Sequence, residues 1–414
     1  MRVTVVAGGS HGDVQPLVPL AQGLAAAGRE VTVAASVDAR SLVTDHGLGF
    51  TAFEVSIADQ MRTEAGRAWI VDSAGRPFRE LRHMRRVYTE LAQSLAHGLL
   101  ALRGTADLFI SGILTVDSIA SIAAHDGAAH ATALLCPFHP TAYGRAGLTA
   151  QNPRTSVFNR SRTRIGHWLL SRSITQAGQI VRRELGMPET GPRGFLRTLG
   201  TVPAVLGASP VLVPTPADWP SNVTVTGPWS IEEPDCYTPP GDLATFLDGG
   251  DPPLYLGFGS LSIVQPERIR EVAVAAARAA GVRLLLSGTD LLGPDGDAFG
   301  IGDAPHSWLF RRVAGVIHHG GAGTTHTALL AGVPQTAVPH IADQPYWGRR
   351  VHEEGLGPAP LPLNRLTVAA LATRMRELAA ATAARARATE LAARARKEDG
   401  VARALEVLGT TVLR

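Results

Sequence analysis

Short apolar runs that alternate with helical patterns are the feature that most constrains how this 414-residue chain can fold. In the first half, the apolar run 3–7 is followed by a glycine-rich turn, a helical pattern over 16–27 and a second run over 30–35. Two further runs, 108–111 and 131–135, are expected to join the same sheet. Because these runs are nearly continuous in apolar residues, both faces of that sheet must be covered. The pattern predicts an α/β fold built from parallel βαβ units.

The same alternation restarts in the second half, after a stretch with ten prolines between positions 209 and 253. A stiff, proline-rich passage in mid-chain is typical of a linker between domains. We therefore expect two doubly wound, Rossmann-like domains that face each other across a cleft. The alanine- and arginine-rich tail from 366 to 408 is expected to be helical throughout. The expected division is an N-terminal domain over 1–215, a linker over 216–250, a C-terminal domain over 251–395 and a C-terminal helix over 396–414 that packs back on the N-terminal domain.

The composition of the chain argues against several classes of protein. The formal charge is only +3, from 39 Lys and Arg against 36 Asp and Glu, which leaves little electrostatic attraction for nucleic acid. The two cysteines, Cys136 and Cys236, suit neither a disulfide scaffold nor a thiolate zinc site. The first residues do not match a signal sequence, and no apolar run is long enough to span a membrane. We expect a soluble, cytoplasmic protein.

The strongest motif joins an apolar run to a helical pattern and reads VIHHGGAGTT over 316–325. Glycines let backbone N–H groups approach a phosphate, and a helix N-terminus offers unpaired donors with a partial positive charge. A histidine in such a turn can also donate to a phosphate oxygen. The plainer alternative is a tight strand-to-helix turn capped by a threonine. The motif matches neither the P-loop pattern nor the dinucleotide-binding glycine pattern.

Two more segments follow predicted strands of the same half. The segment 255–260 ends in a glycine turn with the hydroxyl of Ser260, and the segment 338–345 carries Asp343 and Gln344 just past a strand. Open α/β sheets bind ligands outside the carboxyl ends of their strands, so these loops should converge with the glycine loop. An adjacent acceptor and donor suit the vicinal hydroxyls of a sugar. Asp343 alone could equally cap the next helix.

A comparable turn follows the first predicted strand and reads GSHGDVQP over 9–16. Asp13 in this turn could be a helix N-cap, and His11 a solvated loop residue. The residues of this turn leave that interpretation and a functional one equally open.

These motifs occur together in a known family. The pairing of GSHGDVQPLVPLA with HHGGAGTT and GVPQTAVPHIADQPYWGRRV resembles the inverting nucleotide-sugar glycosyltransferases of family 1. Within that family, the sequence is similar to the bacterial natural-product and sterol-glucosyltransferase-like branch. PADWPSNVTVTGPW, APHSWLF and EDGVARALEVL also fit the resemblance. It implies the GT-B fold, with the donor held mainly by the C-terminal half and the acceptor mainly by the N-terminal half.

The resemblance also implies a role for each matching residue. Asp13 would be the catalytic base, and we group His11 with it. His319 would contact the donor diphosphate, while Asp343 and Gln344 would bind the donor sugar. The other residues that the resemblance assigns to the nucleotide and its diphosphate are Ser10, Gly12, Ser260, His306, Ser307, Trp308, Gly321, Ala322, Gly323 and Thr324.

Two positions depart from the plant members of the family. Many plant relatives place a ribose-binding glutamate where this chain has Thr327, so uridine and deoxythymidine both stay open as the donor base. Asp117 falls near an aspartate that orients the catalytic histidine of plant enzymes. With the acidic Asp13 in the catalytic position, we interpret Asp117 as a helix cap.

The acceptor site has no matching motif. Segments 55–100 and 145–190 interrupt the α/β pattern, and insertions of this kind commonly carry substrate loops. Phe138, His139 and Trp69 are the candidates for acceptor contacts, although core packing explains each of them equally well.

A basic amphipathic pattern runs over 159–183, with Ile165, Trp168 and Leu169 on one helical face. Such a pattern is more often a surface helix with a buried stripe. It also allows weak contact with a membrane surface.

We therefore expect an enzyme that moves a hexose, with glucose favoured, from a UDP- or dTDP-sugar to a hydroxyl of an apolar small molecule such as a polyketide, macrolide, flavonoid or sterol. An inverting transfer needs one base and a stabilised leaving group, which these residues supply without a metal or other cofactor. The alternatives are a sugar-nucleotide epimerase and a non-catalytic nucleotide-binding partner protein of the same fold. The sequence leaves the oligomeric state open.

Overall fold

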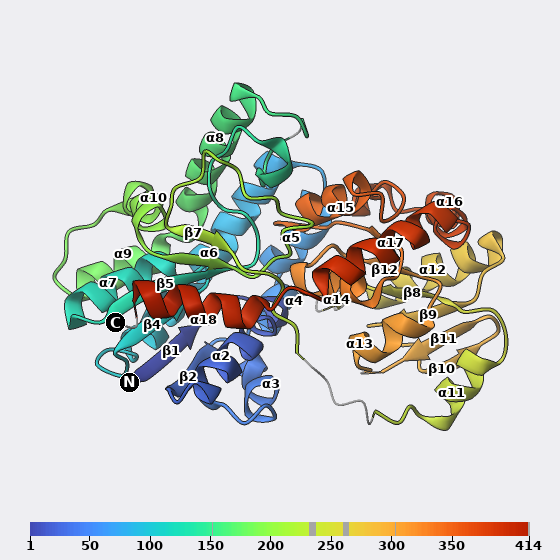
Figure 1. Cartoon of the computed structure of the whole chain (residues 1–414), viewed down its shortest axis with the longest axis horizontal. Coiled ribbons are helices and arrows are strands. Elements are labelled where there is room, and N and C mark those ends of the chain that lie inside the picture. The colour runs from blue at the N-terminus through green and yellow to red at the C-terminus, as the bar shows by residue number, and fades with distance from the viewer. Residues whose placement is uncertain (151, 232–236, 260–264, 303, 413–414) are drawn as a thin grey trace. The chain divides into compact units, whose positions relative to one another are not determined.

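The chain forms two compact units, each built on its own sheet (Figure 1). Unit 1 comprises residues 1–66, 78–231 and 398–414, and unit 2 comprises residues 67–77 and 232–397. Both units are α/β structures with largely parallel sheets, which confirms the expected fold class of two Rossmann-like units. The structure is a computed structural model, and it describes residues 1–150, 152–231, 237–259, 265–302 and 304–412.

A seven-stranded parallel sheet forms the centre of unit 1, in the order β3-β2-β1-β4-β5-β6-β7. The strand order reverses between β1 and β4, and open parallel sheets bind their ligands at such a point. The loop that follows β1 therefore lies where a ligand is expected. The strands are β1 (Arg2–Val6), β2 (Glu30–Ser36), β3 (Gly49–Phe53), β4 (Leu108–Ser111), β5 (Ala129–Leu134), β6 (Ala204–Leu206) and β7 (Val223–Val225).

Helices from both ends of the sequence cover the sheet of unit 1. Figure 1 shows the C-terminal helix α18, in red, beside α2, and the Cγ1 atom of Val401 lies 2.5 Å from the position that a Cβ would take at Gly23. The same core contains Val5, Ile110 and Leu408. The helices are α1 (His11–Val14), α2 (Leu17–Ala26), α3 (Arg40–Thr44), α4 (Ile57–Arg62), α6 (Pro77–Leu100), α7 (Val116–Asp126), α8 (Val157–Ile174), α9 (Gln176–Glu184), α10 (Gly191–Thr201) and α18 (Gly400–Thr411).

Unit 2 contains a six-stranded sheet in the order β10-β11-β9-β8-β12-β13. Only the pairing of β10 with β11 is antiparallel. The order reverses between β8 and β12, so the loops after these two strands meet at a second expected ligand site. The strands are β8 (Leu254–Gly257), β9 (Leu284–Ser287), β10 (Gly293–Asp295), β11 (Ala298–Ile301), β12 (Gly315–His318) and β13 (Gln335–Ala337).

The strands of unit 2 send alternate side chains to two separate cores. Leu256 and Ile317 belong to one core, and Tyr255 and Val316 belong to the other. Both faces of the sheet are therefore buried, as the continuous apolar runs predict. The helices of unit 2 are α11 (Gly241–Asp248), α12 (Pro266–Ala280), α13 (His306–Leu309), α14 (Ala322–Ala331), α15 (Gln344–Glu353), α16 (Val368–Ala379) and α17 (Thr382–Ala395), while α5 (Glu64–Ser73) begins in unit 1 and continues into unit 2.

Several segments differ from the sequence-based expectation. The expected linker 216–250 contains β7, which extends the sheet of unit 1, and α11, which belongs to unit 2. The tail is helical over most of its length, as expected, but it is divided into three helices: α16 ends at Ala379, α17 follows, and α18 begins where the side chain of Asp399 accepts a hydrogen bond from Ala402 N (2.9 Å). The irregular segment 55–100 contains three helices, of which α6 is 24 residues long.

The face of α8 that carries Ile165 and Trp168 is exposed rather than buried. The prediction of a buried apolar stripe on this helix was therefore wrong. Within the part of the chain that the structure describes, no helix is long and apolar enough to cross a membrane.

Candidate active site

The glycine loop of unit 2 runs from the end of β12 to the start of α14. Gly320 has a φ of 92°, which favours glycine, and a Cβ at this position would lie 2.8 Å from the carbonyl oxygen of Gln344. Gly321 is the N-cap of α14 and supplies no side chain to the first amides of that helix. These N–H groups therefore form an uncapped helix N-terminus of the kind that binds phosphate.

His318 is a structural residue of this loop. Its Nδ1 accepts a hydrogen bond from Gly320 N (3.0 Å), and its Nε2 contacts Gln335 Oε1 at 2.9 Å. Nε2 must then carry the proton, so the ring is the neutral tautomer. Burial lowers the pKa of His318 to about 3, which keeps this tautomer at neutral pH. The ring thus stabilises the turn, and both of its nitrogens have hydrogen-bond partners within the protein.

His319 differs from its neighbour because its ring is only half-buried and its buried Nδ1 has no hydrogen-bond partner in the protein. The ring lies against the loop after β8, with Cε1 3.1 Å from the position of a Cβ at Gly259. Burial, together with the charge of His306, lowers the pKa of His319 to about 4. The imidazole is therefore neutral at pH 7 and has one nitrogen to offer to a ligand.

The loop before α15 brings the predicted sugar-binding pair beside the glycine loop. Gln344 Oε1 accepts hydrogen bonds from His340 N (2.8 Å) and Ile341 N (3.1 Å), which leaves the amide nitrogen outside these bonds. Asp343 occupies the N-cap position of α15, yet its Oδ2 accepts from Trp347 Nε1 (2.8 Å) rather than from the backbone. The side chain of Asp343 therefore does not cap α15, contrary to the alternative interpretation.

His340 is a residue of this site that sequence reasoning missed. It is 3% exposed, its ring lies 5.0 Å from that of Phe258, and its Nδ1 has no hydrogen-bond partner. Burial and the charge of His319 lower the pKa of His340 to about 3. The residue lies in the segment 338–345, but nothing in its spacing distinguishes it from a packed histidine.

The predicted pyrimidine-binding residues form the short helix α13. His306 Nε2 contacts the hydroxyl of Tyr255 at 3.0 Å, and its ring stacks on Phe310 with centroids 4.7 Å apart. The ring of Trp308 contacts the guanidinium of Arg312 (4.1 Å) and the ring of Tyr237 (centroids 5.0 Å apart). Helix α13 packs against α14, the helix that begins at the glycine loop. Ser260, another predicted phosphate contact, lies outside the described residues.

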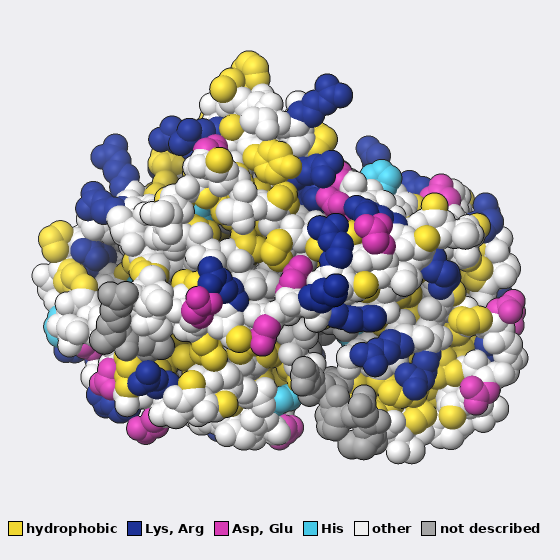
Figure 2. Space-filling model, in the orientation of Figure 1, with side chains coloured by type: hydrophobic (Ala, Val, Ile, Leu, Met, Phe, Trp, Pro, Cys, Tyr) yellow, Lys and Arg dark blue, Asp and Glu magenta, His cyan; other side chains and the backbone are white. Residues whose placement is uncertain are grey.

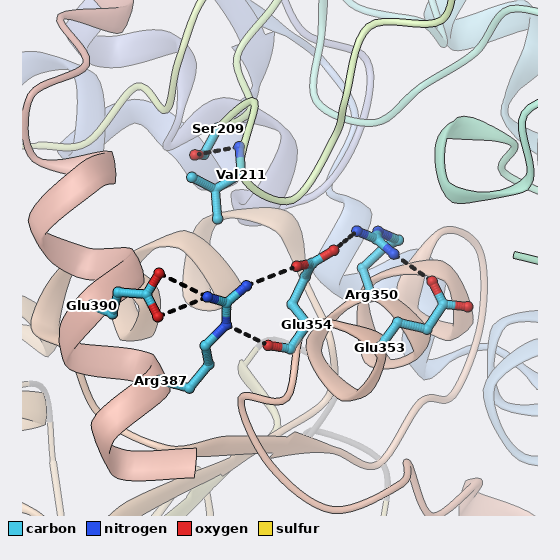
Figure 3. Close-up of polar contacts among 7 residues, drawn as sticks. All are labelled: Ser209, Val211, Arg350, Glu353, Glu354, Arg387 and Glu390. Carbon is cyan, nitrogen blue, oxygen red and sulfur yellow. Dashed lines mark hydrogen bonds and ion pairs between the residues drawn. The ribbon is translucent and has the colours of Figure 1, made fainter. Parts of the chain in front are cut away.

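A network of charged residues joins the C-terminal end of α15, the helix that Gln344 begins, to α17 (Figure 3). Arg350 is fully buried and pairs with Glu353 and Glu354. Arg387 of α17 pairs with Glu354 (3.6 Å) and with Glu390 (2.7 Å). Removal of one partner from a buried pair leaves an uncompensated charge, so this network fixes the C-terminal end of α15 against α17.

In unit 1, the carboxylate of Asp13 closes the turn after β1. Asp13 Oδ2 accepts hydrogen bonds from Ser10 N (2.8 Å) and Ser10 Oγ (3.3 Å), and it lies 2.0 Å from the position of a Cβ at Gly9. Asp13 is the third residue of α1 and not its N-cap. Burial raises the pKa of Asp13 despite these bonds. Burial and, second to it, the charge of Asp13 raise the pKa of Tyr88. His11 begins α1 with an exposed side chain.

Asp117 is not the helix cap that we expected. Thr115 occupies the N-cap position of α7, whereas Asp117 lies in the first turn and is 8% exposed. Its Oδ1 accepts from Ser118 N (3.0 Å), and its Oδ2 has no partner and faces Gly178 of α9. Burial raises the pKa of Asp117 to about 7.

The three candidate acceptor residues are buried in packed regions. Phe138 stacks on His167 with centroids 4.4 Å apart, and His139 Nε2 contacts Leu199 O at 3.0 Å. Trp69 is 6% exposed and lies on the part of α5 that belongs to unit 2. Packing accounts for all three side chains, and an acceptor role for them remains a prediction.

Comparison with known proteins identifies the chain. Residues 300–406 match the family model described as the C-terminal domain of erythromycin biosynthesis protein CIII-like proteins. The chain is 33% identical over 399 residues to the O-mycaminosyltylonolide 6-deoxyallosyltransferase of Streptomyces fradiae, which covers 91% of this chain and 89% of the relative. It is 35% identical over 399 residues to the vancomycin aglycone glucosyltransferase of Amycolatopsis orientalis, with coverages of 91% and 90%. The chain belongs to the family 1 glycosyltransferases.

This glycosyltransferase also matches part of a longer plant protein. A sterol 3-beta-glucosyltransferase of Arabidopsis thaliana is 41% identical over 168 residues, which are 39% of this chain and 26% of that relative. Two solved structures share the fold at lower identity. The glycotransferase of kitacinnamycin has a TM-score of 0.69 and 18% identity over 99% of this chain and 98% of that one. A Streptomyces sp. SF2575 glycosyltransferase complexed with thymidine diphosphate has a TM-score of 0.61 and 22% identity over 99% and 100%.

The fold of this glycosyltransferase is therefore GT-B, and members of its family transfer sugars with inversion and without a metal ion. Among the residues described here, no three His, Cys, Asp or Glu side chains are grouped so that they could hold a metal ion. An Asp-x-Asp triplet at 295–297 begins at the end of β10, where Asp295 pairs with Arg278 (3.5 Å). The predicted donor residues lie in unit 2 except for Ser10 and Gly12, which lie with Asp13 in unit 1.

Proposed function

We propose that this glycosyltransferase moves a hexose from a UDP- or dTDP-sugar to a hydroxyl of an apolar small molecule. Unit 2 binds the nucleotide sugar, and Asp13 of unit 1 is the general base. The observation that carries the proposal is the contrast within the glycine loop, where His318 is satisfied on both ring nitrogens and the buried Nδ1 of His319 is not.

The donor diphosphate is held by His319 and by the amides of Ala322, Gly323 and Thr324. A neutral imidazole donates one hydrogen bond to a phosphate oxygen, and the N-terminus of α14 adds a partial positive charge. These groups act most strongly as the leaving diphosphate gains negative charge in the transition state. Gly259 lets the loop after β8 approach the same ring.

Asp13 takes the proton of the acceptor hydroxyl as the hydroxyl oxygen attacks the anomeric carbon. The oxygen attacks from the face opposite the nucleotide, so the new bond forms with inverted configuration. One carboxylate is sufficient, because no glycosyl-enzyme intermediate has to be resolved. The bonds from Ser10 hold the Asp13 carboxylate in place through Oδ2.

The sugar and the acceptor are inferred from the neighbouring loop and from the relatives. Asp343 and the amide nitrogen of Gln344 offer an acceptor and a donor to adjacent hydroxyls, which favours a fully hydroxylated hexose such as glucose. The relatives named above act on a macrolide, a glycopeptide aglycone and sterols. An apolar, hydroxylated natural product or sterol is therefore the acceptor class to test.

A two-step experiment tests this function. Thermal unfolding is measured with UDP, dTDP, GDP and ADP, each at about 100 times its dissociation constant, where binding adds about 2.7 kcal/mol to the free energy of unfolding. A selective shift with UDP or dTDP selects the donor for transfer assays with macrolide, glycopeptide and sterol acceptors. A β-linked product from an α-linked donor supports the proposal. An enzyme that binds the nucleotide but only epimerises the sugar contradicts it.

A further inference from the structure

Helix α8 buries its polar face and exposes its apolar face. The buried residues Asn159, Thr163, His167 and Ser171 recur every four positions, so they share one side of the helix. The exposed apolar face of α8 consists of Val157 (73% exposed), Phe158 (81%), Ile165 (60%) and Trp168 (43%). This arrangement is the reverse of an ordinary surface helix, which buries its apolar stripe.

The orientation of α8 is fixed by bonds on its polar face. Asn159 Nδ2 donates to the carbonyl oxygens of Ala142 (3.2 Å), Asn152 (3.0 Å) and Arg154 (2.8 Å). The ring of His167 stacks on Phe138 inside unit 1. A rotation that buried the apolar face would break these contacts and expose the groups that make them. The exposed aromatic residues therefore belong to the stable state of the helix.

The surroundings of this apolar face are positively charged. The sequence has no Asp or Glu between positions 127 and 183, whereas eight arginines fall within that stretch. Arg160, Arg164 and Arg172 lie on α8 with exposed side chains, and the guanidinium of Arg172 lies 5.0 Å from the ring centre of Trp168. Figure 2 shows hydrophobic side chains next to Lys and Arg side chains at the top of the view, where Figure 1 places α8.

The N-terminal end of α6 extends the same character. Ser173 Oγ at the end of α8 donates to the carbonyl oxygen of Leu81 (3.3 Å), so the two helices touch there. Phe78 at the start of α6 is 80% exposed. The first three turns of α6 contain one glutamate, Glu80, and four exposed arginines, which are Arg79, Arg82, Arg85 and Arg86.

We propose that α8 and the start of α6 form a docking surface for an anionic lipid bilayer. The exposed aromatic and aliphatic side chains enter the interfacial layer, and the arginines contact the lipid phosphates. A second copy of this chain fits the surface less well, because an isologous contact would bring the two arginine clusters together. This inference is independent of the proposed catalytic roles and concerns where the enzyme works.

Vesicle co-sedimentation tests the proposal with the full chain. Pure phosphatidylcholine vesicles are compared with vesicles that contain about one-third phosphatidylglycerol, at low and at high salt. One variant removes apolar side chains (Phe158→Gln, Ile165→Gln and Trp168→Gln), and a second removes charge (Arg160→Gln and Arg164→Gln). Leu292→Gln is the matched apolar control, since Leu292 is 74% exposed in unit 2. Arg376→Gln with Arg394→Gln is the matched charge control, because both arginines are exposed in unit 2.

The proposal expects the unmodified enzyme and both controls to bind anionic vesicles and to be released by salt. The apolar variant should lose binding at least tenfold, and the charge variant should lose its preference for anionic vesicles. Circular dichroism and thermal unfolding show whether each variant folds. If one of the two variants fails to fold, the proposal is tested with the other.

Three outcomes overturn the proposal. They are no binding by the unmodified enzyme, equal losses in the variants and their controls, and a dimer in sedimentation that the apolar variant converts to a monomer. A higher KM for the acceptor in the apolar variant, without vesicle binding by any form, would assign the face to the acceptor instead.

Discussion

The two strand-to-helix turns at the switch points of units 1 and 2 have the same topology but opposite electrostatics. After β1, the turn is closed by the carboxylate of its own Asp13, which accepts hydrogen bonds from Ser10. After β12, the start of α14 has no capping side chain and His319 has an unpaired buried nitrogen. The first turn therefore contains its own carboxyl group, and the second contains none. In the function proposed above, the same supersecondary unit serves as a base in unit 1 and as a phosphate site in unit 2.

Loss of the carboxylate from the first turn should have the largest effect on catalysis. Asp13→Asn keeps an oxygen that can accept from Ser10 but cannot take a proton from the acceptor. We expect kcat to fall about 10²–10⁴-fold, with the affinity for nucleotide diphosphate unchanged. Steady-state kinetics and calorimetric titration measure the two quantities. Asp59→Asn, an exposed carboxylate of α4, is the control. An Asp13→Asn enzyme that retains more than about a tenth of the rate would exclude Asp13 as the base.

Removal of the imidazole from the second turn should weaken binding instead. Hydrogen bonds to charged groups contribute about 1.5–3 kcal/mol, so His319→Ala should raise the dissociation constant of the nucleotide diphosphate roughly 10–100-fold. His352→Ala, an exposed histidine in the same unit, should leave it unchanged. Calorimetric titration with the nucleotide diphosphate measures the dissociation constants of both variants. Equal affinities in the two variants would count against a phosphate contact by His319.

The two units should respond differently to acid. In unit 2, burial lowers the pKa of His318 and His340 to about 3 and that of His319 and His326 to about 4. As the pH falls below the unfolded value of 6.5, the unfolded state takes up protons that the folded state does not, so unit 2 loses stability. Each such proton is worth up to about 1.4 kcal/mol per pH unit.

In unit 1, an opposite contribution offsets part of this loss. Burial lowers the pKa of His130 to about 4 and that of His167 to about 3, but it raises the pKa of Asp117 to about 7. The folded Asp117 therefore takes up a proton before the unfolded one, which stabilises unit 1 as the pH falls. Hydrogen exchange of peptides from each unit, compared between pH 7 and about 4.5, should show the larger loss of protection in unit 2. Equal losses in both units would contradict this balance.

The glycines of the two turns should differ in their tolerance of a side chain. A Cβ at Gly320 would lie 2.8 Å from the carbonyl oxygen of Gln344, at a φ of 92°, whereas a Cβ at Gly12 would meet nothing closer than Ser10 Oγ at 3.8 Å. Gly320→Ala should therefore lower the free energy of unfolding by about 1–3 kcal/mol, and Gly12→Ala by much less. Denaturant unfolding measures both, and similar values would show that the left-handed turn at Gly320 is not required.

The sequence predicted the sheets well because their strands are buried on both faces. Continuous apolar runs such as 108–111 leave no other interpretation, and the bounds of β4 agree with the prediction. The position of the glycine loop was also predictable, because it directly follows the buried strand β12. The different roles of His318 and His319 could not be predicted from the sequence. They depend on Gln335, which contacts His318 because β13 pairs with β12.

Helix α8 shows a second limit of sequence reasoning. Periodicity correctly indicates a helix but assigns its apolar side to the interior. The actual choice is made by Asn159, whose amide donates to three backbone carbonyl groups of the loop before the helix. A buried polar side chain with several backbone acceptors can therefore reverse the expected orientation of a helix.

The smallest expected effect concerns the bond from Ser10 Oγ to Asp13. This bond is 3.3 Å long, and the shorter bond from Ser10 N (2.8 Å) remains in Ser10→Ala. The free energy of unfolding should fall by only about 0.5–1 kcal/mol. Because hydrogen bonds from Ser10 lower the pKa of Asp13, their partial loss should move the acid limb of kcat/KM to higher pH. Ser56→Ala removes a comparable cap from α4, where Ser56 Oγ accepts from Asp59 N (3.0 Å). It should cost similar stability and leave the pH profile unchanged, so a shift in both variants would show that the acid limb reports stability rather than the protonation of Asp13.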